Sequence, residues 1–150
     1  MLRFGPAGYP QGSKNPKDGL DKTKALGLDA LEVEFVRGAR ISEDKALEVG
    51  RMAKDRDIRL SCHAPYFISF NSENQETRDK SINWVMDTVR AAHNMGAYLI
   101  VIHAASYGKS PGTATQSVID GLSRCKDIMD DEGIGDVILG IETMGKKGQW

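Results

Sequence analysis

The chain has 150 residues, of which 40% are hydrophobic and 27% charged, and its formal net charge is −1. This composition is typical of one globular domain, and it excludes a strongly basic protein that binds nucleic acid through overall charge alone. Its two cysteines lie far apart in the sequence, and the N-terminus lacks the apolar segment of a secretory signal peptide. We therefore expect a reduced, cytoplasmic protein, and no apolar run approaches the roughly 20 residues that span a bilayer.

Short β-rich runs alternate along the chain with longer segments of helical periodicity. The predicted strands cover residues 2–5, 30–36, 58–62, 98–102 and 136–141. Four helices are predicted between them, at residues 16–27, at residues 42–56, in a segment that ends at Gly96, and at residues 113–133. This alternation predicts an α/β fold in which helices connect parallel strands.

The element order is compatible with a doubly wound sheet and with part of a (β/α)8 barrel. The glycine-rich segment at residues 4–12 matches neither G-x-G-x-x-G nor the P-loop pattern, which disfavours a nucleotide-binding doubly wound fold. A complete barrel usually needs about 250 residues. If the fold is a TIM barrel, this chain supplies its first five parallel strands and the four helices between them.

Three residues suited to metal binding occur at the ends of successive predicted strands. His63, His103 and Glu142 are separated by 40 and 39 residues, which is one β/α unit each time. Parallel strands therefore bring the three side chains to one edge of the sheet, where α/β proteins build their sites. Two imidazoles and a carboxylate are ligands of hydrolytic zinc sites, in which zinc lowers the pKa of bound water to about 7. The pattern predicts a zinc site, whereas a single histidine at a strand end is more often a surface or capping residue.

Two other sets of polar residues are predicted to be structural. His93 lies eleven residues after Ile82 on the third helix, on or beside its apolar stripe, so it is expected to pack. Glu32 and Glu34 occupy one face of the second predicted strand. A salt bridge to a neighbour such as Arg59 is favoured over a catalytic role for these carboxylates, because unpaired buried charge is costly.

Three sequence segments together resemble a known enzyme family. They read HAPYFISF at residues 63–70, IHAAS at 102–106 and IETMGKKGQ at 141–149. In this order they resemble the endonuclease IV family of apurinic/apyrimidinic DNA repair enzymes, which are xylose isomerase-like TIM barrels. The resemblance implies a barrel with three zinc ions that hydrolyses the phosphodiester 5′ to an abasic site in double-stranded DNA and leaves a 3′-hydroxyl.

The resemblance also assigns roles to individual residues. It implies that His63 and His103 bind one zinc ion, and that Glu142 bridges this ion to a second one and takes part in catalysis. Tyr66 matches the position of a side chain that enters the DNA at the abasic site. An arginine that acts as a wedge in the family corresponds either to Arg40 or to Arg37.

The family's remaining zinc ligands would come from strands beyond Trp150. We therefore expect residues 1–150 to be the N-terminal part of a single barrel domain, able to complete one zinc site but with little nuclease activity alone. Its partner would be the missing C-terminal half of the barrel or a second copy. Two alternatives remain, namely a metal-dependent sugar isomerase or epimerase with a related barrel, and a non-catalytic metal-binding fragment. Tyr66, placed directly after His63-Ala-Pro, favours the nuclease.

Overall fold

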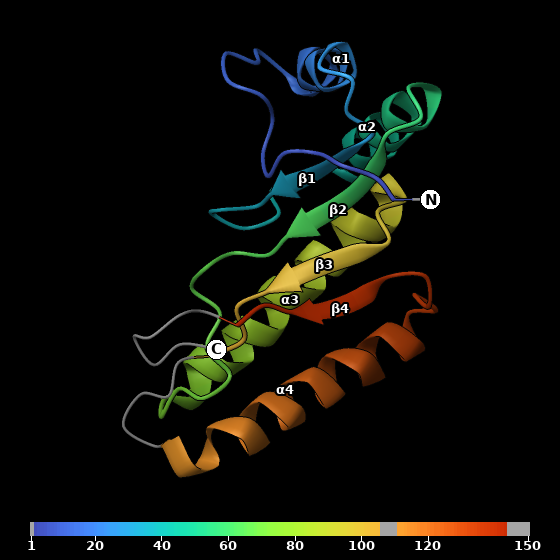
Figure 1. The fold of residues 1–150 in the computed structure, drawn as a ribbon. Coiled ribbons are helices and arrows are strands. Elements are labelled where there is room, and N and C mark those ends of the chain that lie inside the picture. Colours follow the sequence, from blue (N-terminus) through green and yellow to red (C-terminus); the bar gives the residue numbers. More distant parts are fainter. Residues whose placement is uncertain (1, 106–110, 144–150) are drawn as a thin grey trace.

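The computed structural model describes residues 2–105 and 111–143, which form one parallel sheet flanked by helices (Figure 1). The strands lie side by side in chain order, and they are β1 (Ala30–Glu34), β2 (Arg59–His63), β3 (Leu99–Ile102) and β4 (Ile138–Ile141). The helices that alternate with them are α1 (Pro16–Ala25), α2 (Glu43–Asp55), α3 (Gln75–Met95) and α4 (Pro111–Asp131). The α/β class, the four helices and four of the predicted strands are confirmed.

Local signals in the sequence explain where the helices begin and end. The side chain of Asn15 accepts a hydrogen bond from the Asp18 N–H at 2.9 Å, and Pro16 occupies the first helical position of α1. Asn74 caps α3 in the same way. Gly96 has φ +67°, and this left-handed conformation, which glycine adopts at little cost, ends α3 where the sequence predicts.

The prediction that residues 2–5 form the first strand is wrong. This part of the chain runs beside β1, where the carbonyl of Phe4 accepts a hydrogen bond from the Ala30 N–H at 3.0 Å, but the two segments form only an isolated bridge, between Ala7 and Glu32. The carbonyl of Pro6 accepts a hydrogen bond from the Glu32 N–H at 3.0 Å. Because Pro6 has no N–H of its own, it cannot return a hydrogen bond to β1 and the ladder stays incomplete. Among the described residues the sheet therefore has four strands instead of five.

Alternation along the strands separates a buried face of the sheet from an open face. Helices α2 and α3 pack on the buried face, which Figure 1 shows behind the strands. The buried side chains of the strands are apolar, and they include Leu31, Val33, Leu60, Cys62, Ile100 and Ile102. The open face is formed by the intervening residues, which are half-buried or exposed: Glu32, Arg59, Ser61, His63, Leu99 and Val101. In the described part of the chain, no helix combines the length and apolar character needed to cross a bilayer.

Candidate metal centre

The carboxyl ends of three neighbouring strands bring His63, His103 and Glu142 together. His63 is the last residue of β2, while His103 and Glu142 directly follow β3 and β4. The Glu142 N–H donates to the carbonyl of Ile102 at 3.0 Å, which extends the pairing of β3 and β4 up to the site. One ligand atom from each of the three side chains lies within 4.8 Å of the other two. The structure thus brings together the three residues that the sequence spacing selects.

Both imidazoles point one nitrogen at the same carboxylate oxygen. The distance from Nε2 of His63 to Oε2 of Glu142 is 3.4 Å, and the corresponding distance from His103 is also 3.4 Å. The two imidazole rings are tilted by 51° with their centroids 5.0 Å apart. The histidine side chains are 20% and 19% exposed, and the Glu142 side chain is 52% exposed. The nitrogens are therefore held in a partly buried position, while the carboxylate remains open to solvent.

Main-chain carbonyls fix the orientation of both rings. Nδ1 of His63 lies 2.7 Å from the carbonyl oxygen of Ala64, and Nδ1 of His103 lies 3.3 Å from the carbonyl oxygen of Glu142. A carbonyl only accepts hydrogen bonds, so each Nδ1 must be the donor. In a neutral imidazole the lone pair is then on Nε2 and faces an anionic oxygen, an arrangement that a proton or a metal ion between them stabilises. Metal-binding histidines commonly use this arrangement, with the second ring nitrogen bonded to a carbonyl.

The donor set fits a divalent metal ion of the zinc type. Two imidazole nitrogens and one carboxylate oxygen supply three ligands, and a tetrahedral catalytic zinc site keeps its fourth position for water or substrate. Within residues 2–105 and 111–143, no second group of three or more His, Cys, Asp or Glu side chains meets in this way. Among the described residues, a ligand set of this kind therefore occurs at this one edge of the sheet.

The other predicted site residues lie in loops at the same end of the strands. Tyr66 follows β2 and is 70% exposed. Its ring packs edge-on against Phe67, with centroids 5.5 Å apart, and Phe67 in turn contacts Trp84. Arg37 and Arg40 are exposed in the loop between β1 and α2. No described interaction joins these three side chains to the metal centre.

Among the described residues, neither Glu32 nor Glu34 forms the expected salt bridge with Arg59. The parallel register places Glu32 opposite Ser61, whose Oγ lies 3.5 Å from the Glu32 carboxylate. Arg59 lies two residues before Ser61, opposite Ala30. Its guanidinium carbon lies 4.3 Å from the centre of the Tyr98 ring. The prediction is wrong because it used the shared face of the strands but not their register.

The prediction that His93 has a packing role on or beside the apolar stripe of the third helix is also wrong. His93 lies in the last turn of α3, and its side chain is 44% exposed. Its Nδ1 lies 2.7 Å from Oδ1 of Asp136, which precedes β4. A basic side chain in the last turn of a helix interacts favourably with the carbonyl groups at that end. This preference explains the place of His93 better than its position beside the apolar stripe does.

Comparison with known proteins places the chain in a family. Residues 20–150 match the family model described as xylose isomerase-like TIM barrel. An uncharacterized protein of Methanocaldococcus jannaschii is 32% identical over 151 residues, which cover 100% of this chain and 54% of that protein. A probable endonuclease 4 of Mesoplasma florum is 27% identical over 137 residues, which cover 83% of this chain and 45% of the relative. The chain thus spans about half the length of these curated relatives.

Solved structures of two kinds of enzyme resemble the fold. Endonuclease IV of Thermus thermophilus has a TM-score of 0.74 and 22% identity over 99% of this chain and 54% of that one. A D-tagatose 3-epimerase-like protein has a TM-score of 0.76 and 17% identity, covering 99% of this chain and 55% of the other. Of the three segments that carry the endonuclease IV resemblance, Ser106 and residues 144–149 lie outside the described residues. The match across residues 20–150 and the parallel β/α order agree, and the chain belongs to the family of xylose isomerase-like TIM barrels.

Proposed function

We propose that this chain is the N-terminal part of a zinc-dependent DNA repair endonuclease that hydrolyses the phosphodiester 5′ to abasic sites. The observation that carries the proposal is the meeting of His63, His103 and Glu142, with both Nε2 atoms directed at one carboxylate oxygen. This is a ligand set suited to hydrolytic zinc. The similarity to a probable endonuclease 4 supports DNA as the substrate.

Each residue of the centre has a defined task in the proposed reaction. A zinc ion at this place would act as a Lewis acid and would bring the pKa of a bound water to about 7. His63 and His103 would hold the ion through Nε2, and their Nδ1 hydrogen bonds keep the rings from turning. Glu142 is half exposed, so its carboxylate is accessible both to the ion and to a hydrogen bond from the attacking water. The chain thereby orients the nucleophile at the mouth of the sheet.

The loops around the centre supply the proposed contacts to DNA. Tyr66 presents an exposed ring that is supported from behind by Phe67 and Trp84, so it can enter a duplex without losing its orientation. Arg37 and Arg40 provide exposed cations for phosphate. An abasic nucleotide has no base to unstack, so moving it out of the helix costs little. Local contacts of this kind supply the positive charge for DNA that the chain as a whole lacks, since its formal net charge is −1.

A second half of the barrel is part of the proposal. The chain spans about half the length of its relatives, and its sheet has an open face. We infer that further strands, from the rest of a longer protein or from a second copy, close the barrel and supply additional metal ligands. The 150-residue chain by itself then binds one metal ion and cleaves DNA poorly.

Cleavage of a labelled duplex that contains one abasic site tests this function. We expect the longer protein that carries this chain to nick 5′ to the abasic site and leave an end that a DNA polymerase extends. His103→Ala lowers the rate by roughly 10–100-fold or more, as loss of metal support does. His93→Ala is the matched control, since His93 lies at the other end of α3 from the strand ends that form the centre, and it leaves the rate unchanged.

Two other outcomes separate the competing functions. If the longer protein leaves the abasic duplex intact but interconverts D-tagatose with its C3 epimer, the chain belongs to a sugar epimerase. If it binds metal and does neither, the centre is a non-catalytic metal site. Either result overturns the endonuclease proposal.

A further inference from the structure

The loop between β2 and α3 is attached to the end of β3 at two points. The Ala64 N–H donates to the carbonyl of Val101 at 2.8 Å, and the Phe70 N–H donates to the carbonyl of Ala104 at 2.9 Å. Ala64 and Ala104 each directly follow a histidine of the metal centre. Figure 1 shows this loop in green, at the end of the sheet to which the strand arrows point. Tyr66 lies between the two attachment points, beside the metal centre in the chain.

A buried hydroxyl of α3 holds the same loop from the other side. Ser81 is fully buried. Its Oγ donates to the carbonyl of Thr77 at 2.8 Å and accepts a hydrogen bond from the Ser69 N–H at 2.9 Å. Among the described residues, this hydroxyl is the acceptor for the Ser69 N–H. Loss of the hydroxyl therefore leaves a backbone donor of the loop without its partner, which is costly in a partly buried place.

One turn further along α3, a second side chain supports the loop. Ser81 and Trp84 are three residues apart, so they lie on the same face of the helix. The Trp84 ring contacts the Phe67 ring, with centroids 4.3 Å apart, and Phe67 contacts Tyr66. The Tyr66 ring is 70% exposed, so its direction depends on the backbone that carries it more than on packing. That backbone rests on α3 through these two contacts.

The helix itself does not require the Ser81 hydroxyl. Alanine forms helices better than serine, and it would be the more favourable residue at a buried helical position. Thr88 provides a comparison in the same helix, because it is also fully buried and its hydroxyl donates to the carbonyl of Trp84, four residues back, at 2.9 Å. Within the described part of the chain, no loop N–H donates to Thr88. The bond to the loop is what distinguishes Ser81.

We propose that Ser81 is a positioning residue of the endonuclease, which fixes the loop so that Tyr66 is presented to DNA. This inference rests on the proposed function. Ser81 is buried behind the loop, so it would act through Ser69 and the backbone that leads to Tyr66. The loop has its own bonds to β3 beside both histidines, so loss of the hydroxyl would leave the metal ligands in place. The effect is therefore expected on binding of the duplex and not on binding of zinc.

Hydrogen exchange of the 150-residue chain tests the attachment itself. We expect the amides of residues 66–70 to exchange about tenfold faster or more in Ser81→Ala, as loss of a hydrogen bond allows, while β2 stays protected. Thr88→Val is the matched control, because it removes a buried hydroxyl with the same bond to its own helix and leaves the loop untouched. Unchanged exchange of residues 66–70 in Ser81→Ala would overturn the proposal.

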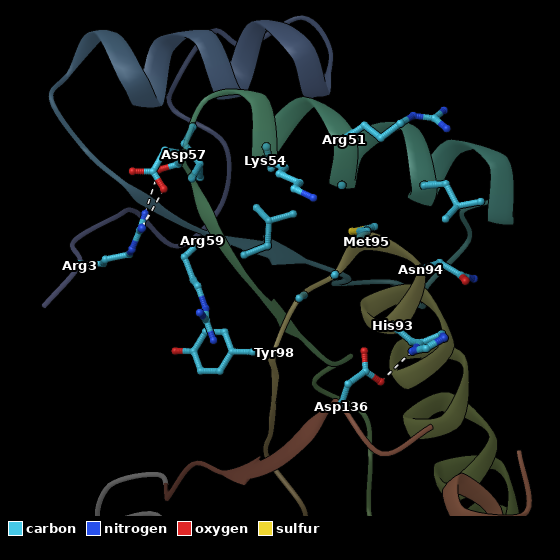
Figure 2. A pocket seen from close by; sticks show the side chains of 17 residues that line it. Arg3, Arg51, Lys54, Asp57, Arg59, His93, Asn94, Met95, Tyr98 and Asp136 are labelled. Atoms are coloured by element: carbon cyan, nitrogen blue, oxygen red, sulfur yellow. Dashed lines mark hydrogen bonds and ion pairs between the residues drawn. The ribbon is translucent and has the colours of Figure 1, made fainter. Parts of the chain in front are cut away.

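A second control loosens the opposite end of α3. Figure 2 shows His93 and Asp136 directed at each other, with 2.7 Å between Nδ1 and Oδ1. His93→Ala removes this contact between α3 and the segment before β4. It leaves exchange in residues 66–70 unchanged if the loop depends on Ser81. Equally fast exchange of these residues in His93→Ala would show that any weakening of α3 frees the loop, which contradicts a specific role of Ser81.

Kinetics of the longer protein on a duplex with one abasic site test the positioning role. Ser81→Ala raises KM by about fivefold or more and leaves kcat and the zinc content nearly unchanged, as loss of uniform binding does. In a Tyr66→Ala background, the added Ser81→Ala raises KM no further, because the side chain that Ser81 positions is already gone. A merely structural role would instead give the same added loss in both backgrounds.

The possible failures of the two proposals can be told apart. An unchanged KM in Ser81→Ala, an equal rise of KM in Thr88→Val, or additive effects of Ser81→Ala and Tyr66→Ala would overturn the positioning role while the wild type still cleaves the abasic duplex. Loss of zinc from Ser81→Ala would also overturn it, since the hydroxyl would then support the metal centre. A wild-type longer protein that does not cleave overturns the endonuclease proposal, and the positioning role with it.

Discussion

The position of one hydrogen on each imidazole decides what the metal centre can do. Hydrogen bonds from Nδ1 to main-chain carbonyls leave Nε2 of His63 and of His103 as the ligand atoms. The acceptors belong to the backbone, so they do not depend on any further side chain. The two ligands are therefore oriented before a metal ion arrives, which lowers the cost of binding it.

Cys62 is next to His63 in the sequence but belongs to the opposite face of the sheet. It is fully buried, and burial raises the pKa of its thiol to about 12. Burial likewise raises the pKa of Cys125 to about 12. At pH 8 both thiols are then protonated and inert, because the thiolate is the reactive species.

Thiol labelling checks this expectation. We expect no reaction of either cysteine with a chromogenic disulfide reagent in native buffer at pH 8, and reaction of both in denaturant. Rapid labelling of the native chain would contradict the burial of Cys62 and with it the face assigned to His63.

At the scale of elements, the approach of α2 to α3 depends on Gly50. A Cβ added at this position would lie 2.5 Å from the carbonyl oxygen of Met95, which is main chain and cannot move aside cheaply. We expect Gly50→Ala to destabilise the chain by roughly 1–3 kcal/mol, as overpacking does. Denaturant unfolding followed by circular dichroism measures this difference.

Gly112→Ala is the matched control for this substitution. Gly112 lies in α4, and a Cβ there meets nothing within 4 Å. The exchange is therefore neutral or stabilises the helix by about 0.5–1 kcal/mol. Equal stabilities of the two variants would show that α2 and α3 do not pack as closely as described.

The elements were predictable where the signal is local. Proline and asparagine at the start of α1 and Gly96 at the end of α3 act within one helical turn, so their boundaries follow from the sequence. The absence of a strand at residues 2–5 also has a local cause, because Pro6 has no N–H to donate. The missing donor prevents strand formation only because this segment runs beside β1 and would have to pair with it. The pairing of Arg59 with Tyr98 depends on strand register, which spacing alone does not determine.

The metal centre was predictable because one β/α unit separates each of its residues from the next. Equal spacing brings His63, His103 and Glu142 to one edge of any parallel sheet, whatever the details of packing. The rotation of the rings and the contact between Nδ1 of His93 and the carboxylate of Asp136 were not predictable. Both depend on side-chain torsion angles, which the spacing of residues in the sequence does not determine.

At the scale of the whole molecule, the sheet exposes apolar residues that a closed barrel would cover. Ile138 and Ile141 of β4 are 59% and 39% exposed, and Phe4, beside β1, is 63% exposed. An open strand edge with apolar side chains is prone to association. We expect the 150-residue chain to form dimers or larger species in a concentration-dependent way.

Size-exclusion chromatography with light scattering measures this association. Ile138→Lys places a charge on the exposed strand and shifts the chain toward the monomer. Ile119→Lys, at a 49% exposed position of α4 away from the sheet, is the control and leaves the distribution unchanged. A chain that stays monomeric at all concentrations would contradict the inferred need for a partner.

Zinc content is the most direct test of the metal centre. The purified chain is equilibrated with zinc, freed of loosely bound metal and analysed by mass spectrometry of the metal. We expect about one zinc ion per chain in the wild type and in His93→Ala, and much less in His103→Ala, since a catalytic-type zinc site needs its three protein ligands. Equal zinc content in the wild type and in His103→Ala would contradict the assignment of the centre.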